Sequence, residues 1–234
     1  MIDLRSEIVD TARAIDRMPQ RGGGRLVMVM SARKGEGVSS VASSLAVLMS
    51  GRAARPVWLL DLDFLGNQQF RLFQAKTFSR FGAAGRALDG SLNAPPFFQI
   101  MPQIRAVDGN TRGQQKYLAV HKIEHSNLLV SRFRTEILKP GQKIQVSSRD
   151  EYWRALRSVS DWAIVDGLSI DHSSAGLSLC RHIDGVILVV EADSTQASEV
   201  NTLRNEIEAH GGRCLGVVVN RVRSDARMAD RLSL

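Results

Sequence analysis

A glycine-rich turn between two apolar segments is the strongest chemical signal in this sequence. The turn carries Gly35 and Gly37, and it separates the apolar run 27–30 from a periodic apolar stretch that opens at Ser39 and Ser40. Glycines let backbone N–H groups converge on an anion, and the positive end of a helix dipole would face the same point. The spacing therefore predicts a phosphate-binding loop.

One position in this turn departs from the usual pattern. A P-loop normally reads Gly-Lys followed by Ser or Thr, whereas this chain reads Gly37-Val38-Ser39. The absent lysine would be the largest fixed positive charge on the phosphates, and losing a preorganised charge of this kind typically costs about 2.7–4 kcal/mol of transition-state stabilisation. Arg33 and Lys34 are the two nearby candidates to replace that charge.

Carboxylates follow two of the apolar segments. Asp61 and Asp63 come at the end of the segment 57–61, and Asp166 ends the segment 161–166. An open α/β sheet places its ligand outside the carboxyl ends of its strands, and carboxylate oxygens suit Mg²⁺. We therefore predict metal coordination beside the glycine loop, although an aspartate at a strand end can also serve only as a helix cap.

The elements that position these groups follow from hydrophobic periodicity. Near-continuous apolar strands alternate with helix-period segments, which is typical of a parallel sheet covered on both faces. We therefore predict an α/β fold, doubly wound, with a mostly parallel sheet and helices on both faces. The strands are expected at 26–30, 57–61, 127–132, 161–166, 184–191 and 214–220. Residues 64–125 give only a surface excursion with short strands.

Length and composition indicate a single core. The chain has 234 residues, of which 44% are hydrophobic, enough for one domain and short for two. Residues 1–24 are expected to form an amphipathic helix and a flexible Gly-rich linker, and residues 25–234 a P-loop NTPase-like domain. The N-terminal helix has two possible positions, on its own domain or on a partner.

Charge and hydropathy restrict the environment and the partners. The formal net charge is +7, but the arginines are spread along the chain, which favours a solvated surface over a nucleic-acid patch. No run of eighteen apolar residues occurs, so no membrane span is predicted and the protein is expected to be cytoplasmic. Cys180 and Cys214 lack metal or redox spacing and are expected to be reduced, buried thiols.

Taken together, the motifs resemble those of the deviant P-loop ATPases related to MinD and ParA. Within that group the chain looks most like the bacterial tyrosine kinases of capsule and exopolysaccharide synthesis, the BY-kinases. Their loop usually reads Pro-Gly-Glu-Gly-Lys-Ser, and residues 34–39 correspond to it. The segments 61–73 and 164–169 correspond to the second and third family motifs, the latter without its prolines. The resemblance covers about residues 25–222.

The resemblance implies a site for ATP or ADP with Mg²⁺. Ser39 corresponds to the hydroxyl that binds the metal, Asp63 and Asp166 to carboxylates that hold it through water, and Asp61 to the group that activates the attacking hydroxyl. The candidate nucleotide-binding residues are Lys34, Gly35, Glu36, Gly37, Val38, Ser39, Ser40, Asn220 and Arg221, with Asn220 and Arg221 beside the adenine. The candidate catalytic residues are Asp61, Asp63 and Asp166, and the candidate metal ligands are Ser39, Asp63 and Asp166.

The resemblance also implies a partner and a pathway. Family kinases dock on the cytoplasmic part of a membrane polysaccharide copolymerase, which would place this chain peripherally at the inner membrane. They end in a tyrosine-rich tail, whereas Tyr117 and Tyr152 are the only tyrosines here. We therefore predict a role in exopolysaccharide synthesis or export, of capsule or holdfast type, with weakened or lost ATP binding and no tail autophosphorylation.

The sequence leaves the oligomeric state and the activity of the protein open. A homo-oligomer is compatible with the resemblance, but Arg13 and Arg17 lie four residues apart and do not reproduce the family's Glu-x-x-Arg-x-x-Arg spacing. Without the loop lysine, kinase or ATPase turnover is expected to be impaired or absent. A MinD/ParA-type positioning ATPase that binds DNA or membrane is one alternative function. A non-catalytic scaffold with a relic nucleotide site is another.

Overall fold

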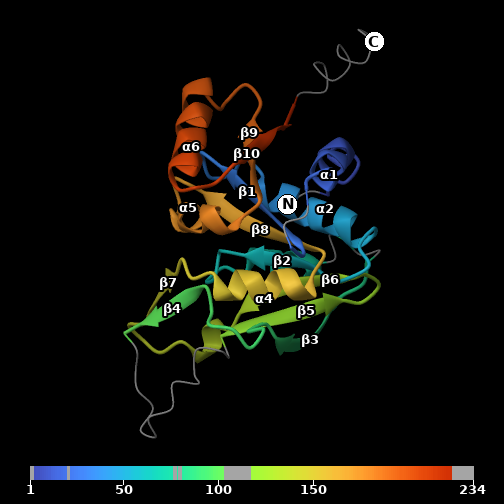
Figure 1. Cartoon of the computed structure of the whole chain (residues 1–234), viewed down its shortest axis with the longest axis vertical. Helices are drawn as coiled ribbons and strands as arrows, with labels where there is room; N and C mark the ends of the chain where they lie inside the picture. The colour runs from blue at the N-terminus through green and yellow to red at the C-terminus, as the bar shows by residue number, and fades with distance from the viewer. Residues whose placement is uncertain (1–2, 20–21, 76–77, 79–80, 103–116, 223–234) are drawn as a thin grey trace, which may run out of the picture.

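The computed structural model describes residues 3–19, 22–75, 78, 81–102 and 117–222. Its strands form one large sheet and a separate pair (Figure 1). The large sheet contains β1 (Arg25–Ser31), β2 (Val57–Asp61), β3 (Ala84–Asp89), β5 (Leu118–Ile123), β6 (Leu128–Phe133), β8 (Trp162–Ser169), β9 (Gly185–Glu191) and β10 (Cys214–Asn220). The pair consists of β4 (Phe98–Met101) and β7 (Lys143–Val146).

The large sheet is mostly parallel, as predicted. Its eight strands have the order β10-β9-β1-β8-β2-β6-β5-β3. The neighbours from β10 to β6 pair in parallel, whereas β5 pairs antiparallel with both β6 and β3. The carboxyl ends of the parallel strands therefore meet at one edge of the sheet, where the glycine loop also lies.

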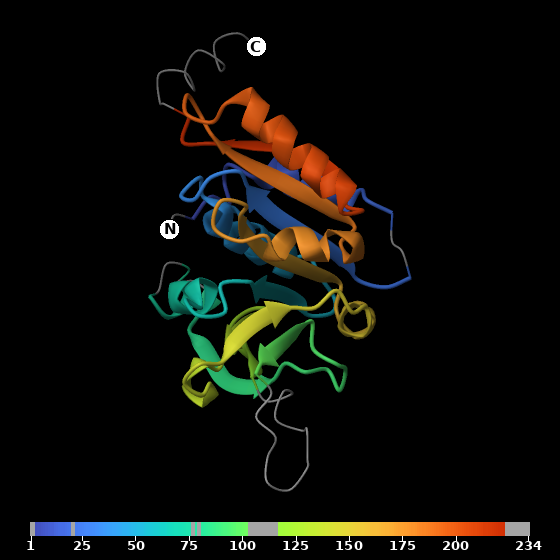
Figure 2. The ribbon, with the colours of Figure 1, turned by 90° about the vertical axis from the view of Figure 1, so that its left-hand side faces the viewer.

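Helices cover both faces of the sheet, which confirms the doubly wound α/β class. The helices α1 (Val9–Asp16), α2 (Val38–Ser50) and α3 (Gln68–Gln74) contribute to the core on one face. The helices α4 (Glu151–Val159), α5 (Ala175–Leu179) and α6 (Ala197–Ala209) contribute to the core on the other. Figure 2 shows α5 and α6, in orange, on the near side of the sheet and α2 behind it. Short 3₁₀ turns occupy Thr135–Ile137 and Cys180–His182. None of the helices in these residue ranges is long and apolar enough to cross a membrane.

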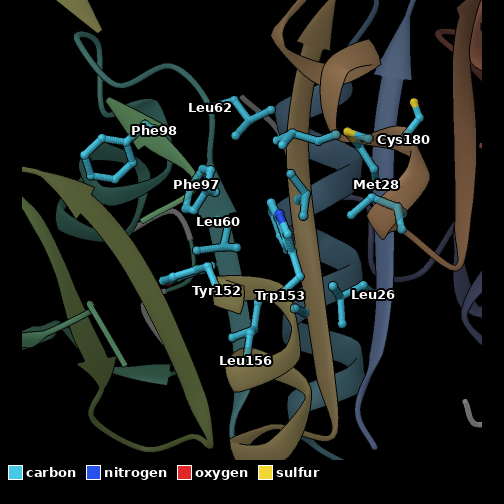
Figure 3. Packing of buried hydrophobic residues seen from close by; sticks show 14 of the residues in the cluster. Leu26, Met28, Leu60, Leu62, Phe97, Phe98, Tyr152, Trp153, Leu156 and Cys180 are labelled. Atoms are coloured by element: carbon cyan, nitrogen blue, oxygen red, sulfur yellow. The ribbon is translucent and has the colours of Figure 1, made fainter. Parts of the chain in front are cut away.

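The strand β1 shows why the central strands form where they do. Leu26 and Met28 point to the face covered by α4, α5 and α6, and Val27 and Val29 point to the α2 face, all without exposed surface. Figure 3 shows the first of these two clusters, with Trp153 between the strands and α4. Each such side chain contributes about 1.5–3 kcal/mol by burial, so this strand is fixed in the centre of the sheet.

The N-terminal segment packs on its own domain. Leu4, Ile8 and Ile15 are buried in the same cluster as α2, and the Leu4 N–H donates to Ser44 Oγ at 2.9 Å. The end of the glycine-rich segment is also held, because the Gly24 N–H donates to the Arg157 carbonyl at 2.8 Å. Gly24 is thus anchored to the segment at the end of α4.

The end strand β10 differs from the sequence expectation. It pairs only with β9 among the described strands, and Val217 and Val219 remain 48% and 54% exposed. Cys180 is buried as expected, whereas Cys214 at the start of β10 is only half-buried. The apolar pattern of β10 matches that of a central strand, but its position at the end of the sheet leaves part of it uncovered.

Candidate functional site

The glycine loop joins β1 to α2 with the geometry of an anion-binding turn. Gly35 and Gly37 have φ values of 95° and 105°, a backbone region that side-chain-bearing residues rarely adopt. A Cβ on Gly37 would lie 2.1 Å from Asn220 Nδ2. Gly37 precedes the first turn of α2, so the free N–H groups and positive dipole end of that helix face the loop.

Glu36 stabilises this loop from within the protein. Its side chain is 2% exposed; it accepts a hydrogen bond from the Arg33 N–H at 2.8 Å and a short one from the Thr195 hydroxyl. Its carbonyl accepts a bond from Asn220 Nδ2 at 2.8 Å. The Glu36 side chain therefore connects the loop to the segment after β9. Asn220, expected beside the adenine, also holds the loop.

The two candidate replacements for the missing lysine have different surroundings. The Arg33 guanidinium is paired with Glu199 of α6 at 2.7 Å and donates to the Ser194 carbonyl at 3.3 Å, so α6 holds it. Lys34 lines the cavity above the loop, while its backbone N–H donates to Asp171 Oδ2 at 3.0 Å. Only Lys34 of this pair borders the space where phosphates would lie. Val38 borders the same space with an uncharged side chain.

The carboxylates lie together at the ends of β2 and β8. Asp61 and Asp166 are register partners and are 4% and 0% exposed. Burial, together with the charge of Asp166, raises the pKa of Asp61 well above its ordinary value. Burial also raises the pKa of Asp166, and hydrogen bonding by Ser39 and Gln69 opposes that shift. Asp61 is engaged further, because it accepts bonds from the N–H groups of Asp63 and Gln69.

Asp63 is placed differently from the other two acids. It lines the cavity, and its Oδ1 accepts a bond from the Gly66 N–H at 2.8 Å. Its Oδ2 would lie 1.9 Å from a Cβ on Gly66, so any side chain at position 66 would displace the Asp63 carboxylate. The turn after β2 therefore holds Asp63 at the wall of the cavity.

Gln69 is a site residue that sequence reasoning misses. Its side chain has no exposed surface, and Nε2 donates to Asp166 Oδ2 at 2.6 Å and to the Ser39 carbonyl at 3.0 Å. Its backbone N–H donates to Asp61 Oδ2 at 2.9 Å. One residue thus connects the two buried carboxylates with the first turn of α2. The only sequence signal is its place eight residues after Asp61, inside the segment 61–73, where the motif gives Gln69 itself no role.

These elements enclose a cavity of about 480 Å³, within the usual range for small-molecule sites. At one end, Arg221 donates to the Gly35 carbonyl at 2.8 Å and pairs with Glu191 at 2.7 Å. The remaining lining comes from the N-terminal segment, the loop, the turn after β2 and the end of β8. The lining residues are Leu4, Ser31, Lys34, Gly35, Gly37, Val38, Ser39, Ser40, Asp63, Gln68, Leu168, Ser169, His172, Asn220 and Arg221.

The donor set fits a magnesium ion held largely through water. Within the described residues, no three His, Cys, Asp or Glu side chains are close enough to bind a metal together. Asp166 Oδ1, however, is buried and lacks a hydrogen-bond partner in that part of the chain, and such an acceptor suits a metal-bound water. Mg²⁺ usually keeps several waters and takes few protein ligands. Ser39 and Asp63 border the cavity, so they would complete such a site together with Asp166.

Known proteins resemble this chain in structure but not in sequence. No protein-family model and no curated protein sequence matches it. The VpsO kinase domain aligns with a TM-score of 0.59 and 19% identity over 94% of this chain and 95% of its own. The kinase domain of the Escherichia coli tyrosine kinase ETK aligns with a TM-score of 0.53 and 16% identity over 92% and 75%.

MinD is also a structural neighbour. In the MinC:MinD cell division complex of Aquifex aeolicus, it aligns with a TM-score of 0.55 and 12% identity over 90% of this chain and 73% of its own. Identities this low define the fold alone. The fold is that of the P-loop NTPases of the MinD/ParA type, with BY-kinase domains among the structural neighbours, as the sequence motifs predicted.

Proposed function

We propose that this chain is a cytoplasmic BY-kinase-like protein that binds ADP or ATP with Mg²⁺ weakly and acts in exopolysaccharide synthesis or export. The observation that carries the proposal is the cavity over the first turn of α2. Its wall keeps the glycine turn, Ser39 and Asp63, and places Val38 where the P-loop lysine would be. The backbone would bind phosphate, while the main transition-state charge is absent.

The surroundings of Tyr152 argue against its phosphorylation. Tyr152 has no exposed surface, and its hydroxyl donates to the Gly90 carbonyl at 3.0 Å. Burial also raises its pKa far above the ordinary tyrosine value. Tyr117 stacks on Phe133, with ring centroids 5.6 Å apart. With no other tyrosine in the chain, we infer a nucleotide-dependent binding role in place of phosphotransfer to a tail.

The pathway and partner parts of the proposal rest on the kinship of fold and motifs. We propose that the cytoplasmic part of a membrane polysaccharide copolymerase is the partner, and that this contact brings the chain to the inner membrane. Nucleotide binding would then control the contact. Nucleic acid is not part of this proposal.

Calorimetric titration with Mg-ADP and Mg-ATP tests nucleotide binding. Wild type is expected to bind weakly, and Val38→Lys to bind about tenfold to a hundredfold more tightly, because charge-assisted hydrogen bonds contribute roughly 1.5–3 kcal/mol. Val38→Met provides a side chain of similar length without charge, and it should stay at the wild-type affinity. Absence of binding by both wild type and Val38→Lys would contradict the proposal.

A scaffold with a relic site is the second candidate function. Two observations favour it: the aliphatic Val38 in the loop, and the engagement of Arg33 by Glu199, which keeps that cation away from the phosphates. A scaffold predicts no thermal stabilisation by ADP and Mg²⁺. A ligand at a hundred times its dissociation constant should add about 2.7 kcal/mol to the free energy of unfolding.

A further inference from the structure

Two buried acceptor atoms, one on β8 and one on α3, have no donor among the described residues. Asp166 Oδ1 and Gln69 Oε1 both lack a hydrogen-bond partner among the described residues, and neither side chain has any exposed surface. They belong to side chains that are already joined, because Gln69 Nε2 donates to Asp166 Oδ2 at 2.6 Å. Asp166 Oδ1 is therefore the free oxygen of a carboxylate whose other oxygen is bonded, and Gln69 Oε1 is the free oxygen of an amide whose nitrogen is bonded.

The orientation of the Gln69 amide is fixed by its other contacts. Nε2 donates both to Asp166 Oδ2 and to the Ser39 carbonyl. Rotating the amide by half a turn would bring Oε1 against two acceptors, so Oε1 must point away from them. A buried acceptor without a donor destabilises the folded state, which makes a donor molecule the simplest complement for these two oxygens.

A neutral acceptor has an electrostatic advantage at this position. Asp61, Asp63 and Asp166 already bring three carboxylates to one end of the sheet, and two of them are buried. A further carboxylate would add repulsion among these groups, whereas an amide oxygen accepts a hydrogen bond without adding charge. Water carries two donor hydrogens, so one molecule would satisfy two acceptors.

We propose that Gln69 is a positioning residue for the metal: its Oε1 accepts a hydrogen bond from a water of hydrated Mg²⁺ that Asp166 also holds. This assignment rests on the proposed nucleotide function and adds a residue to it. Gln69 would orient the water and, through Nε2, keep Asp166 and the Ser39 backbone in place. Partners of this outer kind typically contribute tenfold to a hundredfold to metal affinity.

The test compares ADP affinity in Mg²⁺ with ADP affinity in EDTA, by calorimetry, for the full chain. Wild type should gain affinity from Mg²⁺. Gln69→Met has a side chain of similar length but no amide. Its ADP affinity in Mg²⁺ should be about tenfold weaker than that of wild type, and its ADP affinity in EDTA should equal that of wild type. Gln74→Met is the matched control, because Gln74 is an exposed residue at the end of the same helix. It should behave as wild type in both buffers.

Gln69→Asn gives a second, uncharged variant if Gln69→Met does not fold. Its amide is one methylene shorter, so it should also lose part of the gain from Mg²⁺ and keep the wild-type affinity in EDTA. The assignment is overturned if Mg²⁺ adds nothing to wild-type ADP affinity, or if Gln69→Met loses equal affinity in both buffers, as a purely structural role requires. Absence of ADP binding by wild type in either buffer would instead overturn the proposed function on which the assignment rests.

Discussion

The two walls of the cavity differ in the charged groups that they retain from the usual P-loop motifs. The loop wall, from Lys34 to Ser40, keeps the backbone shape that binds anions but has an aliphatic side chain in place of its fixed cation. The carboxylate wall, built by β2, β8 and α3, keeps all three acids in a hydrogen-bond network in which Asp61 and Asp166 are buried and Asp63 lines the cavity. Backbone geometry depends on many contacts and survives one substitution, whereas a single charge depends on one residue.

The largest expected effect comes from breaking the backbone of the loop wall. Gly37→Ala would force a side chain into a left-handed conformation, at a cost of roughly 1–3 kcal/mol, and against Asn220. We expect a less stable protein that has lost ADP binding. Gly35→Ala has the same kind of strain but nothing within 4 Å, so denaturant titration should show a smaller loss. Equal losses would contradict the role given to the Gly37–Asn220 contact.

The carboxylate wall should appear as a pH dependence of stability. Burial raises the pKa of Asp61 and Asp166, so the folded state binds more protons than the unfolded state above about pH 4. Their contribution is full below that pH and is lost as pH rises through the raised pKa values, by up to about 1.4 kcal/mol per pH unit for each proton. In denaturant titrations at several pH values, the free energy of unfolding should fall less steeply with rising pH for Asp61→Asn than for wild type. An unchanged slope would show that Asp61 is not the source.

The smallest expected effect distinguishes the two cations of the loop. Lys34→Ala should weaken Mg-ADP binding severalfold, about 1 kcal/mol, because Lys34 borders the cavity and its charge is partly screened. Arg33→Ala is the comparison variant. It removes the ion pair with Glu199, worth about 0.2–1 kcal/mol of stability, and should change affinity less. If Arg33→Ala weakens Mg-ADP binding, measured by calorimetry, more than Lys34→Ala does, then Arg33 and not Lys34 is the cation that contributes to binding.

The sequence predicts the centre of the fold well, for a physical reason. Strands buried on both faces must be apolar throughout, and β1, β2, β8 and β9 carry that pattern. An apolar pattern does not show whether a strand lies at the edge of the sheet. The pattern of β10 therefore resembles that of a central strand, although Val217 and Val219 are exposed. Val159 likewise fits the apolar period of α4 but is 41% exposed, since it is the last residue of the helix.

The candidate site is predictable where a motif fixes it, and less so where contacts from distant segments decide. The sequence places the loop, Asp61 and Asp166 at neighbouring strand ends, and the structure brings them together. It does not reveal that the Glu36 side chain turns toward Thr195, because that contact spans 159 residues. Gln69 lies on a short helix that begins after the left-handed Asn67 (φ 48°), and its role depends on contacts with Asp166 and Ser39, which are distant in the sequence.

The inward packing of the N-terminal segment limits how this chain can meet another copy. Ala12 and Ile15 of α1 are buried in the same cluster as α2 of the same chain, and Leu4 lines the cavity. Because these side chains already pack within their own chain, they are not available for contact with a neighbouring copy. Exchange of α1 between subunits would first have to separate it from α2 and move Leu4 away from the cavity.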